Sequence, residues 1–469
     1  MIIRRLTTLQ GALQLPPDRL QAGTALLLAA LAEGKSTISP WPDFGDYRRL
    51  IQWLEAAEIS FSYADQLLEV EGRGLRSPSS ISLPLPITSS AGVNLFWTTW
   101  ATADLGGSIR LKGRSAWLKR LQRDLSSITE LETTVSQDEL HVKRIALPHS
   151  SYGKSAEKRN YHLLLALLHR LPFHWKAHWV SDDPLTPLLQ EFGVPIELNE
   201  IQELNQQQNE GLEQLQELLH ALEEEAAEAN AKRSALERRI MRLSRKRPES
   251  FAEWKFNPVE RFTGGEISLL ADPLIAGFCA VLATLLPQSN LILEQVCVTP
   301  TRAGIFSALG RLGAEQKRSR ERKVSGESAA TLRVQHNGEL SGRKFSAETV
   351  QSIGEALPLL AVATSFAEEE SLFRGLSLRK GTPIALLADN LRKAGVEVGE
   401  FEDGLVLRGR EELDGAEFTS EGELSIALAN AALALLSHGE SSLDDEGVAI
   451  LEELWPGWHS TLKELVYEV

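Results

Sequence analysis

Cysteine is scarce in this chain: among 469 residues there are two, Cys279 and Cys297. Two cysteines cannot build a disulfide framework or a cysteine-rich zinc site, and such low usage fits a reducing compartment. The first residues, MIIRRLTTLQGALQL, also lack the apolar core and the cleavage site of a signal peptide. We therefore expect a cytoplasmic protein, and nothing in the sequence calls for a cofactor.

Long apolar runs and an excess of positive charge are also missing. The longest apolar stretch, 267–286, is interrupted by Asp272 and Pro273 and is too short to cross a bilayer. A formal net charge of −15 gives no general attraction for phosphate backbones. The run EQKRSRERK at 315–323 alternates in charge beside a predicted strand, which favours a solvated sheet edge over a nucleic-acid patch. The histidines show no metal-ligand spacing. We expect no nucleic-acid, membrane or metal partner.

Apolar helical segments, in contrast, are abundant. Six segments rich in Ala and Leu are apolar nearly all round, which is typical of fully buried helices. They are residues 24–34, 95–107, 163–172, 276–286, 357–367 and 425–436. Most are followed by a short β-rich stretch, an amphipathic helix and closing strands. Six irregularly spaced copies are too few for a solenoid, so the sequence predicts an α/β protein with two lobes of three strand-helix units each.

One segment departs from this pattern. From Leu212 to Leu243, apolar or small residues recur at alternating spacings of three and four, which is typical of a coiled-coil seam. At 1.5 Å per residue the helix would be roughly 48 Å long. Its first half is acidic and its second half basic, so two such helices placed antiparallel would pair opposite charges. We expect a helical coiled-coil insertion over 198–247. It would form either a homodimer contact through 212–243 or a hairpin packed on its own chain.

Several stretches match the motifs of a known family. They are GALQLPPDRLQAGTALLLAALAEGKSTI at 11–38, SSAGVNLFW at 89–97, KVSGESAATLRV at 323–334, EALPLLAVATSFAEEESLFRG at 355–375, SEGELSIALANAALAL at 420–435 and WPGWHSTLKEL at 455–465. Through them the chain resembles the 5-enolpyruvylshikimate-3-phosphate (EPSP) synthase family. The resemblance is weak over 130–265. It implies a two-lobed inside-out α/β barrel with the ligand cleft between the lobes, lobe I being 1–14 with 262–469 and lobe II 15–261.

The resemblance implies an enolpyruvyltransferase of the shikimate pathway, in which the 5-hydroxyl of shikimate 3-phosphate adds to phosphoenolpyruvate and phosphate is expelled. Two phosphates and two carboxylates then require a cluster of Lys and Arg, with a carboxylate base. Arg19 matches the cation of the family's first loop, and Ser90 begins the motif whose arginine binds phosphoenolpyruvate. The element that holds shikimate phosphate falls on Lys158, Arg159 and Asn160.

Further site residues follow from the same resemblance. Glu355 takes the place of the catalytic aspartate, and Arg379 and Lys380 fall on a Lys-Glu pair of the family, which makes Lys380 the candidate cationic acid. Arg114 would replace an arginine of the loop after the second-repeat strand. The alternative interpretation is that Arg19, Arg379 and Lys380 are solvated loop charges. In that case Glu355 is a carboxylate favoured by a helix N-terminus.

Several anion-binding positions of the family are replaced. Phe96 stands where the arginine for phosphoenolpyruvate should be, Leu424 stands at the histidine, and the late lysine is absent from 450–454. Each lost contact to a phosphate lowers the rate on the order of a hundredfold or more. The sequence therefore predicts either a weakened transferase or a non-catalytic paralogue that acts as a scaffold through its insertion. The sister UDP-N-acetylglucosamine enolpyruvyltransferase is disfavoured because 113–117 contains no cysteine.

Overall fold

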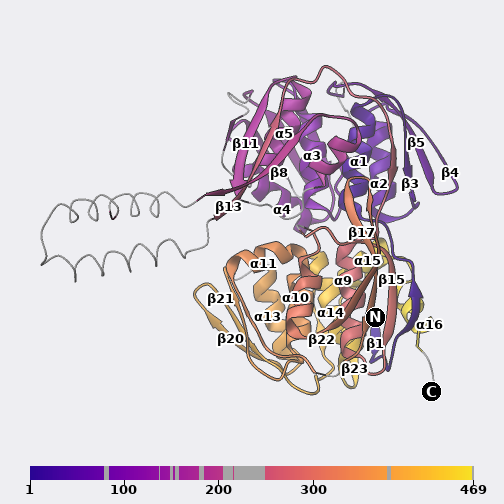
Figure 1. Ribbon diagram of the computed structural model, residues 1–469, viewed down its shortest axis with the longest axis vertical. Helices are drawn as coiled ribbons and strands as arrows, with labels where there is room; N and C mark the ends of the chain where they lie inside the picture. Colours follow the sequence, from indigo (N-terminus) through magenta and orange to yellow (C-terminus); the bar gives the residue numbers. More distant parts are fainter. Residues whose placement is uncertain are drawn as a thin grey trace, which may run out of the picture.

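The computed structural model describes residues 1–78, 84–136, 138–147, 152–153, 158–178, 184–203, 215, 249–300, 302–337, 339–377 and 382–466. Figure 1 shows two bodies, one above the other. The upper body contains α1 to α6, and the lower body contains α9 to α16 together with the N-terminus. The predicted dimer segment 212–243, apart from Leu215, lies outside the described residues, as do Arg379 and Lys380.

Each body is built around three buried helices. They are α1 (Arg19–Leu31), α3 (Ala91–Ala101) and α5 (Arg159–Leu168) above, and α9 (Pro273–Leu285), α12 (Leu357–Thr364) and α14 (Leu424–Leu436) below. Helix α3 packs against α1 and α5, and α9, α12 and α14 pack against one another. Nearly every residue of α1, α9 and α14 is buried. Their sequences suit this position because they are apolar on all sides.

Polar caps set where these helices begin. Asp18 caps α1 and Asp272 caps α9, each by accepting hydrogen bonds from two backbone N–H groups, and the Ser90 hydroxyl caps α3. Such side chains satisfy donors that the first turn of a helix leaves without partners. Helix α1 therefore begins at Arg19, ahead of the Thr24 that the apolar run alone predicts.

Three four-stranded sheets complete the upper body, in the orders β14-β3-β5-β4, β6-β7-β9-β8 and β10-β11-β13-β12. In each, the first two strands are parallel and the others antiparallel. The strands are β3 (Glu33–Ser39), β4 (Ser60–Ala64), β5 (Leu67–Arg73), β6 (Leu85–Pro86), β7 (Ser108–Lys112), β8 (Leu131–Ser136), β9 (Glu139–Arg144), β10 (Tyr152–Gly153), β11 (Phe173–His178), β12 (Glu197–Glu203), β13 (Glu249–Phe256) and β14 (Glu266–Ser268).

The lower body repeats this arrangement in the sheets β2-β15-β17-β16 and β18-β19-β21-β20, and a three-stranded sheet, β1-β23-β22, lacks the fourth strand. Its strands are β1 (Ile2–Arg4), β2 (Gln10–Leu13), β15 (Asn290–Cys297), β16 (Glu315–Val324), β17 (Glu327–Gln335), β18 (Lys344–Phe345), β19 (Ser371–Arg374), β20 (Glu397–Phe401), β21 (Gly404–Arg408), β22 (Glu417–Phe418) and β23 (Glu440–Leu443). Because β1 and β2 lie here while α1 lies above, the first connection between the bodies follows β2.

The two connections lie side by side. The N–H of Asp18 donates to the carbonyl of Leu270, and the N–H of Asp272 donates to the carbonyl of Pro16. These bonds place the starts of α1 and α9 next to each other. The caps of the two helices thus meet between the bodies.

Residues 198–203 differ from the expected helical insertion. They belong to β12, which pairs antiparallel with β13 from Leu198 opposite Trp254 to Glu203 opposite Glu249. This pairing gives the backbone groups partners within a sheet, and Leu198 packs against the hydrophobic core. A helical segment therefore cannot begin before residue 204.

A second set of helices covers the buried ones. They are α2 (Gly45–Ala56), α4 (Ser115–Ser126), α6 (Leu185–Glu191), α10 (Gly304–Leu312), α11 (Ala347–Ile353), α13 (Pro383–Lys393), α15 (Asp445–Leu454) and α16 (Trp458–Glu464), with a 3₁₀ turn, η2 (Gly354–Ala356). Helices α2, α4 and α10 are amphipathic, with leucines and aromatic residues on the buried side. Their polar sides face outward.

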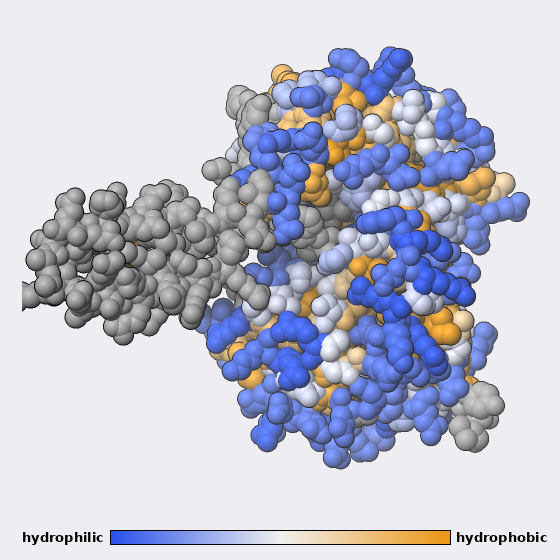
Figure 2. Space-filling model, viewed as in Figure 1, coloured by the Kyte–Doolittle hydropathy of each residue, from blue (hydrophilic) through white to orange (hydrophobic). Residues whose placement is uncertain are grey.

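The surface is mainly polar. Figure 2 shows hydrophilic residues over most of the visible face, and the charged strand β16 is an exposed sheet edge, as its sequence predicts. Within the described ranges, no helix is long and apolar enough to cross a membrane. The same residues contain no His, Cys, Asp or Glu group that could hold a metal ion. Both cysteines are buried, and burial raises the pKa of the Cys297 thiol to about 12.

Candidate active site between the two bodies

The first turns of four buried helices, α1, α3, α5 and α9, meet at one cavity. It has a volume of about 230 Å³ and is lined from α1, α3, α5 and α9, from η2 before α12, and by side chains of α4 and α10. Helix N-termini carry partial positive charge and free backbone N–H groups, which favour anions. The cavity is therefore placed where a small anionic ligand would gain most from the fold.

The structure brings together part of the predicted site. Arg19, Ser90, Asn160 and Glu355 all line this cavity. Lys158, Arg159 and Arg114 do not line it. Sequence reasoning missed four charged residues of the lining, which are Asp18, Asp272, Arg302 and Arg120.

Arg19 is held by a carboxylate of the chain itself. Its Nε lies 2.8 Å from Oδ2 of Asp272, and its Nη1 donates to Oγ of Ser89 at 2.6 Å. Burial alone would lower the pKa of Arg19, but the nearby carboxylates of Asp272, Glu355 and Asp46 outweigh burial and raise it above its usual value. The guanidinium is therefore permanently charged and already paired.

Arg302 lies behind Arg19 in an equally buried network. Its Nη2 is 2.5 Å from Asp18 Oδ2, and its Nη1 is 3.5 Å from Glu327 Oε1. Burial raises the pKa of Asp18 even though Arg302 opposes that effect. The carboxylate that caps α1 is thus part of a charge network inside the protein. In the sequence, an aspartate directly precedes each of the two helices, as Asp18 and as Asp272 before Pro273. This pattern is typical of helix N-caps and could have identified both of them.

Glu355, the predicted base, is also paired. It lies in η2, and its Oε1 is 2.7 Å from Nη2 of Arg120 on α4. This contact joins the lower and upper bodies. The attraction of Glu355 is the largest cause of the raised pKa of Arg120, ahead of the opposing effect of burial.

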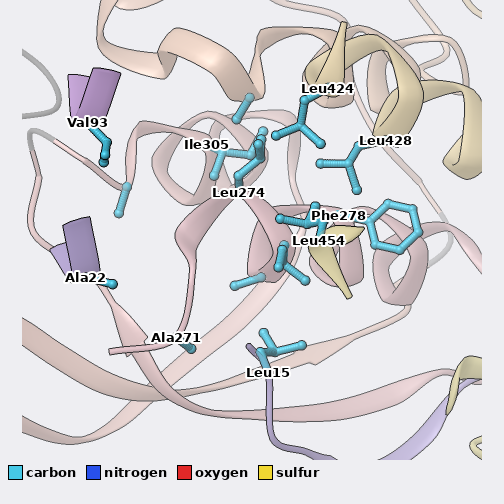
Figure 3. Packing of buried hydrophobic residues seen from close by; sticks show 14 of the residues in the cluster. Leu15, Ala22, Val93, Ala271, Leu274, Phe278, Ile305, Leu424, Leu428 and Leu454 are labelled. Atoms are coloured by element: carbon cyan, nitrogen blue, oxygen red, sulfur yellow. The ribbon is translucent and has the colours of Figure 1, made fainter. Parts of the chain in front are cut away.

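Apolar side chains lie at and near the cavity. Phe96 is buried and contributes to the lining, and Leu20 lies over Gly92, where an added Cβ would come within 2.7 Å of Leu20 Cδ1. Leu424 begins α14 and belongs to the same hydrophobic cluster as Ile305, and Figure 3 shows both. An anion facing these residues would lose water without gaining a hydrogen bond.

The structure gives Arg159 and Arg114 other surroundings. The Arg159 guanidinium is buried 4.2 Å from the ring centroid of Trp254 and donates to Oδ1 of Asn160 at 2.5 Å. Arg114 Nη2 lies 2.7 Å from Glu453 Oε1 and lines a separate, larger cavity. Arg159 thus supports Asn160 from within the core, and Arg114 belongs to the mouth of the cleft.

The fold and the site together define a class of α/β proteins. Proteins of this class have two bodies, and their buried helices direct their first turns at a cleft between the bodies. A sequence model described as EPSP synthase (3-phosphoshikimate 1-carboxyvinyltransferase) matches residues 3–144 and 245–462. The chain belongs to the EPSP synthase family.

Known proteins agree with this assignment. The 3-phosphoshikimate 1-carboxyvinyltransferase of Syntrophomonas wolfei is 27% identical over 454 residues, which is 94% of each chain. The one from Synechocystis sp. is 34% identical over 206 residues, so the match covers 43% of this chain and about half of the relative, 45%. EPSP synthase from Acinetobacter baumannii has a TM-score of 0.70 at 17% identity, covering 99% of this chain and 97% of that one. The enolpyruvyl transferase NikO from Streptomyces tendae has a TM-score of 0.64 at 15% identity, covering 99% and 96%.

Proposed function

We propose that this protein is a non-catalytic member of the EPSP synthase family. One observation carries the proposal: each arginine that lines the cavity is paired with a carboxylate of the chain. Arg19 pairs with Asp272, Arg302 with Asp18, and Arg120 with Glu355. A phosphate would have to compete with these carboxylates, and breaking either of the two buried pairs, Arg19–Asp272 or Arg302–Asp18, costs about 3–5 kcal/mol.

Phe96 supports the same conclusion. A buried aromatic ring offers no hydrogen bond to a carboxylate or phosphate. The resemblance matches Phe96 to the arginine of the family's motif for phosphoenolpyruvate. Charge-assisted contacts are the main source of affinity for such ligands. The arginines that could bind an anion in this cavity are already paired with carboxylates of the chain, which supports the proposal.

The test is isothermal titration of the protein with shikimate 3-phosphate and then with phosphoenolpyruvate, together with a phosphate-release assay. The expected result is no heat with either ligand and no phosphate above background. EPSP synthase from Acinetobacter baumannii, assayed alongside, verifies both ligands. Turnover within about a hundredfold of that control would contradict the proposal.

Enolpyruvyl transfer from phosphoenolpyruvate to shikimate 3-phosphate is the second candidate. It is favoured by the lining itself, since Arg19, Ser90, Asn160 and Glu355 share one cavity. Under this function Glu355 removes the hydroxyl proton, and Glu355→Gln abolishes phosphate release. Glu369→Gln, at an exposed carboxyl of the lower body, leaves the release unchanged. Phosphate release that persists in Glu355→Gln would exclude this role.

A protein without catalytic activity would act through its insertion. We propose that 204–247, which follows β12 (Glu197–Glu203), supplies a coiled-coil docking element, and that 212–243 pairs two copies in the cytoplasm. The predicted lobes, 1–14 with 262–469 and 15–261, are part of this proposal with one change: lobe I resumes after Ser268, because β14 (Glu266–Ser268) pairs with β3 of the upper body. The six related units belong to the same proposal. Replacing Leu219 and Leu222 by Glu should halve the mass measured by light scattering, whereas replacing the neighbouring Glu217 by Gln should not. An unchanged mass in the first variant would remove the dimer.

A further inference from the structure

Helix α4 of the upper body presents positive charge to the cleft mouth, and the lower body presents negative charge. The α4 basic face comprises Arg114, Lys119, Arg120 and Arg123. The lower acidic rim comprises Glu355, Glu421, Glu423, Glu446 and Glu453. A cavity of about 730 Å³ lies between them and is lined by members of both sets. The two sides of the mouth are therefore complementary in charge.

Direct ion pairs join the two sides. Arg120 and Glu355 are 2.7 Å apart, and Glu453 on α15 accepts both Arg114 of the α4 basic face, at 2.7 Å, and Arg49 of α2, at 2.6 Å. Glu453 belongs to the segment 450–454, where the resemblance predicts that the family's late lysine is absent. Its carboxylate instead makes a contact between the bodies.

Other contacts near these ion pairs also require the two bodies to lie close together. The indole N–H of Trp117 on α4 donates to the carbonyl of Gly422 at 3.1 Å. The guanidinium carbons of Arg49 and Arg114 lie 5.7 and 5.5 Å from the Trp117 ring centroid. A Cβ added to Gly45 at the start of α2 would come within 1.9 Å of the Glu453 carbonyl oxygen, so α2 and the end of α15 touch. These contacts can form only while the cleft is closed.

We infer that the α4 basic face and the lower acidic rim form an electrostatic latch that holds the two bodies closed without any ligand. A cleft with positive charge on both sides needs an anion to bring the sides together. Here the lower side supplies its own carboxylates. The inference goes beyond the proposed lack of catalysis, because it concerns the arrangement of the bodies and not turnover.

The strength of the latch should depend on the salt concentration. The pairs are only partly buried, so salt should weaken them as the Debye length falls from about 10 Å at about 0.1 M to about 3 Å at about 1 M. The paired caps of α1 and α9 at the connections are shielded from salt by burial. Raising the salt concentration should therefore open the mouth while the connections act as the hinge.

The experiment measures the distance between the bodies in the full chain. Spin labels are attached to cysteines placed at Ser62 on β4 and at Glu402 between β20 and β21, both of which are exposed. The native cysteines are buried and will not be labelled. Pulsed electron resonance is then recorded at low and at high salt for the otherwise unchanged chain, for Glu355→Gln combined with Glu453→Gln, and for Glu440→Gln, whose partner Arg4 lies within the lower body.

We expect one narrow distance distribution at low salt that shifts and broadens at high salt. The double variant should show the shifted distribution already at low salt, and Glu440→Gln should behave as the parent. Distributions that neither salt nor the double variant changes would overturn the latch. A response to salt that the double variant leaves intact would overturn the assignment of Glu355 and Glu453. Because no substrate is used, the outcome is independent of the titration and phosphate-release tests.

Discussion

Ion pairs beside the two connections between the bodies are buried away from water, whereas ion pairs at the mouth of the cleft are partly exposed to water. The side chains of Arg302 and Asp18 are each 2% exposed, but those of Arg120 and Glu355 are 36% and 30% exposed. A pair deep in the protein is hardly screened, and losing one partner leaves an uncompensated charge. Pairs near water contribute little each and respond to salt. The inner pairs therefore fix the framework, and the outer pairs determine how the cleft is held.

The sharpest way to test the inner set is Arg302→Met. Methionine fills much of the same space, but it leaves Asp18 and Glu327 buried without their shared cation. We expect the free energy of unfolding to fall by about 3–5 kcal/mol. Urea denaturation followed by tryptophan fluorescence measures the change.

Arg4→Met is the matched control, because Arg4 pairs with Glu440 at the surface, where the side chains are 79% and 59% exposed. Its loss should cost at most about 1 kcal/mol. Equal losses in the two variants would contradict the distinction between buried and exposed pairs. A loss for Arg302→Met below about 1 kcal/mol would mean that its two carboxylates are neutral in the folded protein.

The outer set is tested by a double-mutant cycle on Arg120 and Glu355, each replaced by Gln. We expect a coupling energy of about 0.5–1 kcal/mol at low salt that falls toward zero at about 1 M salt. The comparison is the same cycle on Arg19→Met and Asp272→Asn, whose coupling should persist at high salt because both side chains are buried. A coupling at Arg120–Glu355 that salt does not change would remove the difference between the two regions.

Much of the fold could be predicted because the buried helices are recognisable from composition alone. Helix α14 begins at Leu424, next to the expected residue 425. Helix α1 was expected too late because Asp18 and Arg19, which are polar, are nevertheless buried in an ion network. The strand at 198–203 was missed because its partner, β13, lies beyond the insertion. Local pattern identifies the helices, but pairing across long sequence distances decides their ends and the strands.

The site was predictable only where a motif survives. Arg19 and Glu355 were found by resemblance, whereas Asp272 was not, because it meets Arg19 from 253 residues away. In the run 158–160, only Asn160 lines the cavity. Successive residues of a helix point about 100° apart, so neighbours in sequence cannot all face one ligand. In the segment 450–454 the sequence showed only that a lysine is absent, and the two arginine partners of Glu453 became visible only in three dimensions.

The smallest expected effect concerns Glu423, the half-buried residue before α14. Burial raises the pKa of its carboxyl, while Arg120 and Arg123 oppose that effect. A raised folded-state pKa means that this residue's contribution to stability, present below the unfolded pKa, is lost as pH rises through the folded pKa.

Glu423→Gln should therefore become more stable relative to the parent as pH rises from about 5 to about 8, by a few tenths of a kcal/mol. Glu421→Gln, at an exposed carboxyl of the same loop, is the control and should change the stability less than Glu423→Gln does. Urea denaturation across this pH range measures both. Salt screens the two arginines but not burial, so the gain from Glu423→Gln should grow at high salt, whereas the Arg120–Glu355 coupling shrinks. A gain that shrinks with salt would mean that charge repulsion among the rim carboxylates, and not burial, raises this pKa.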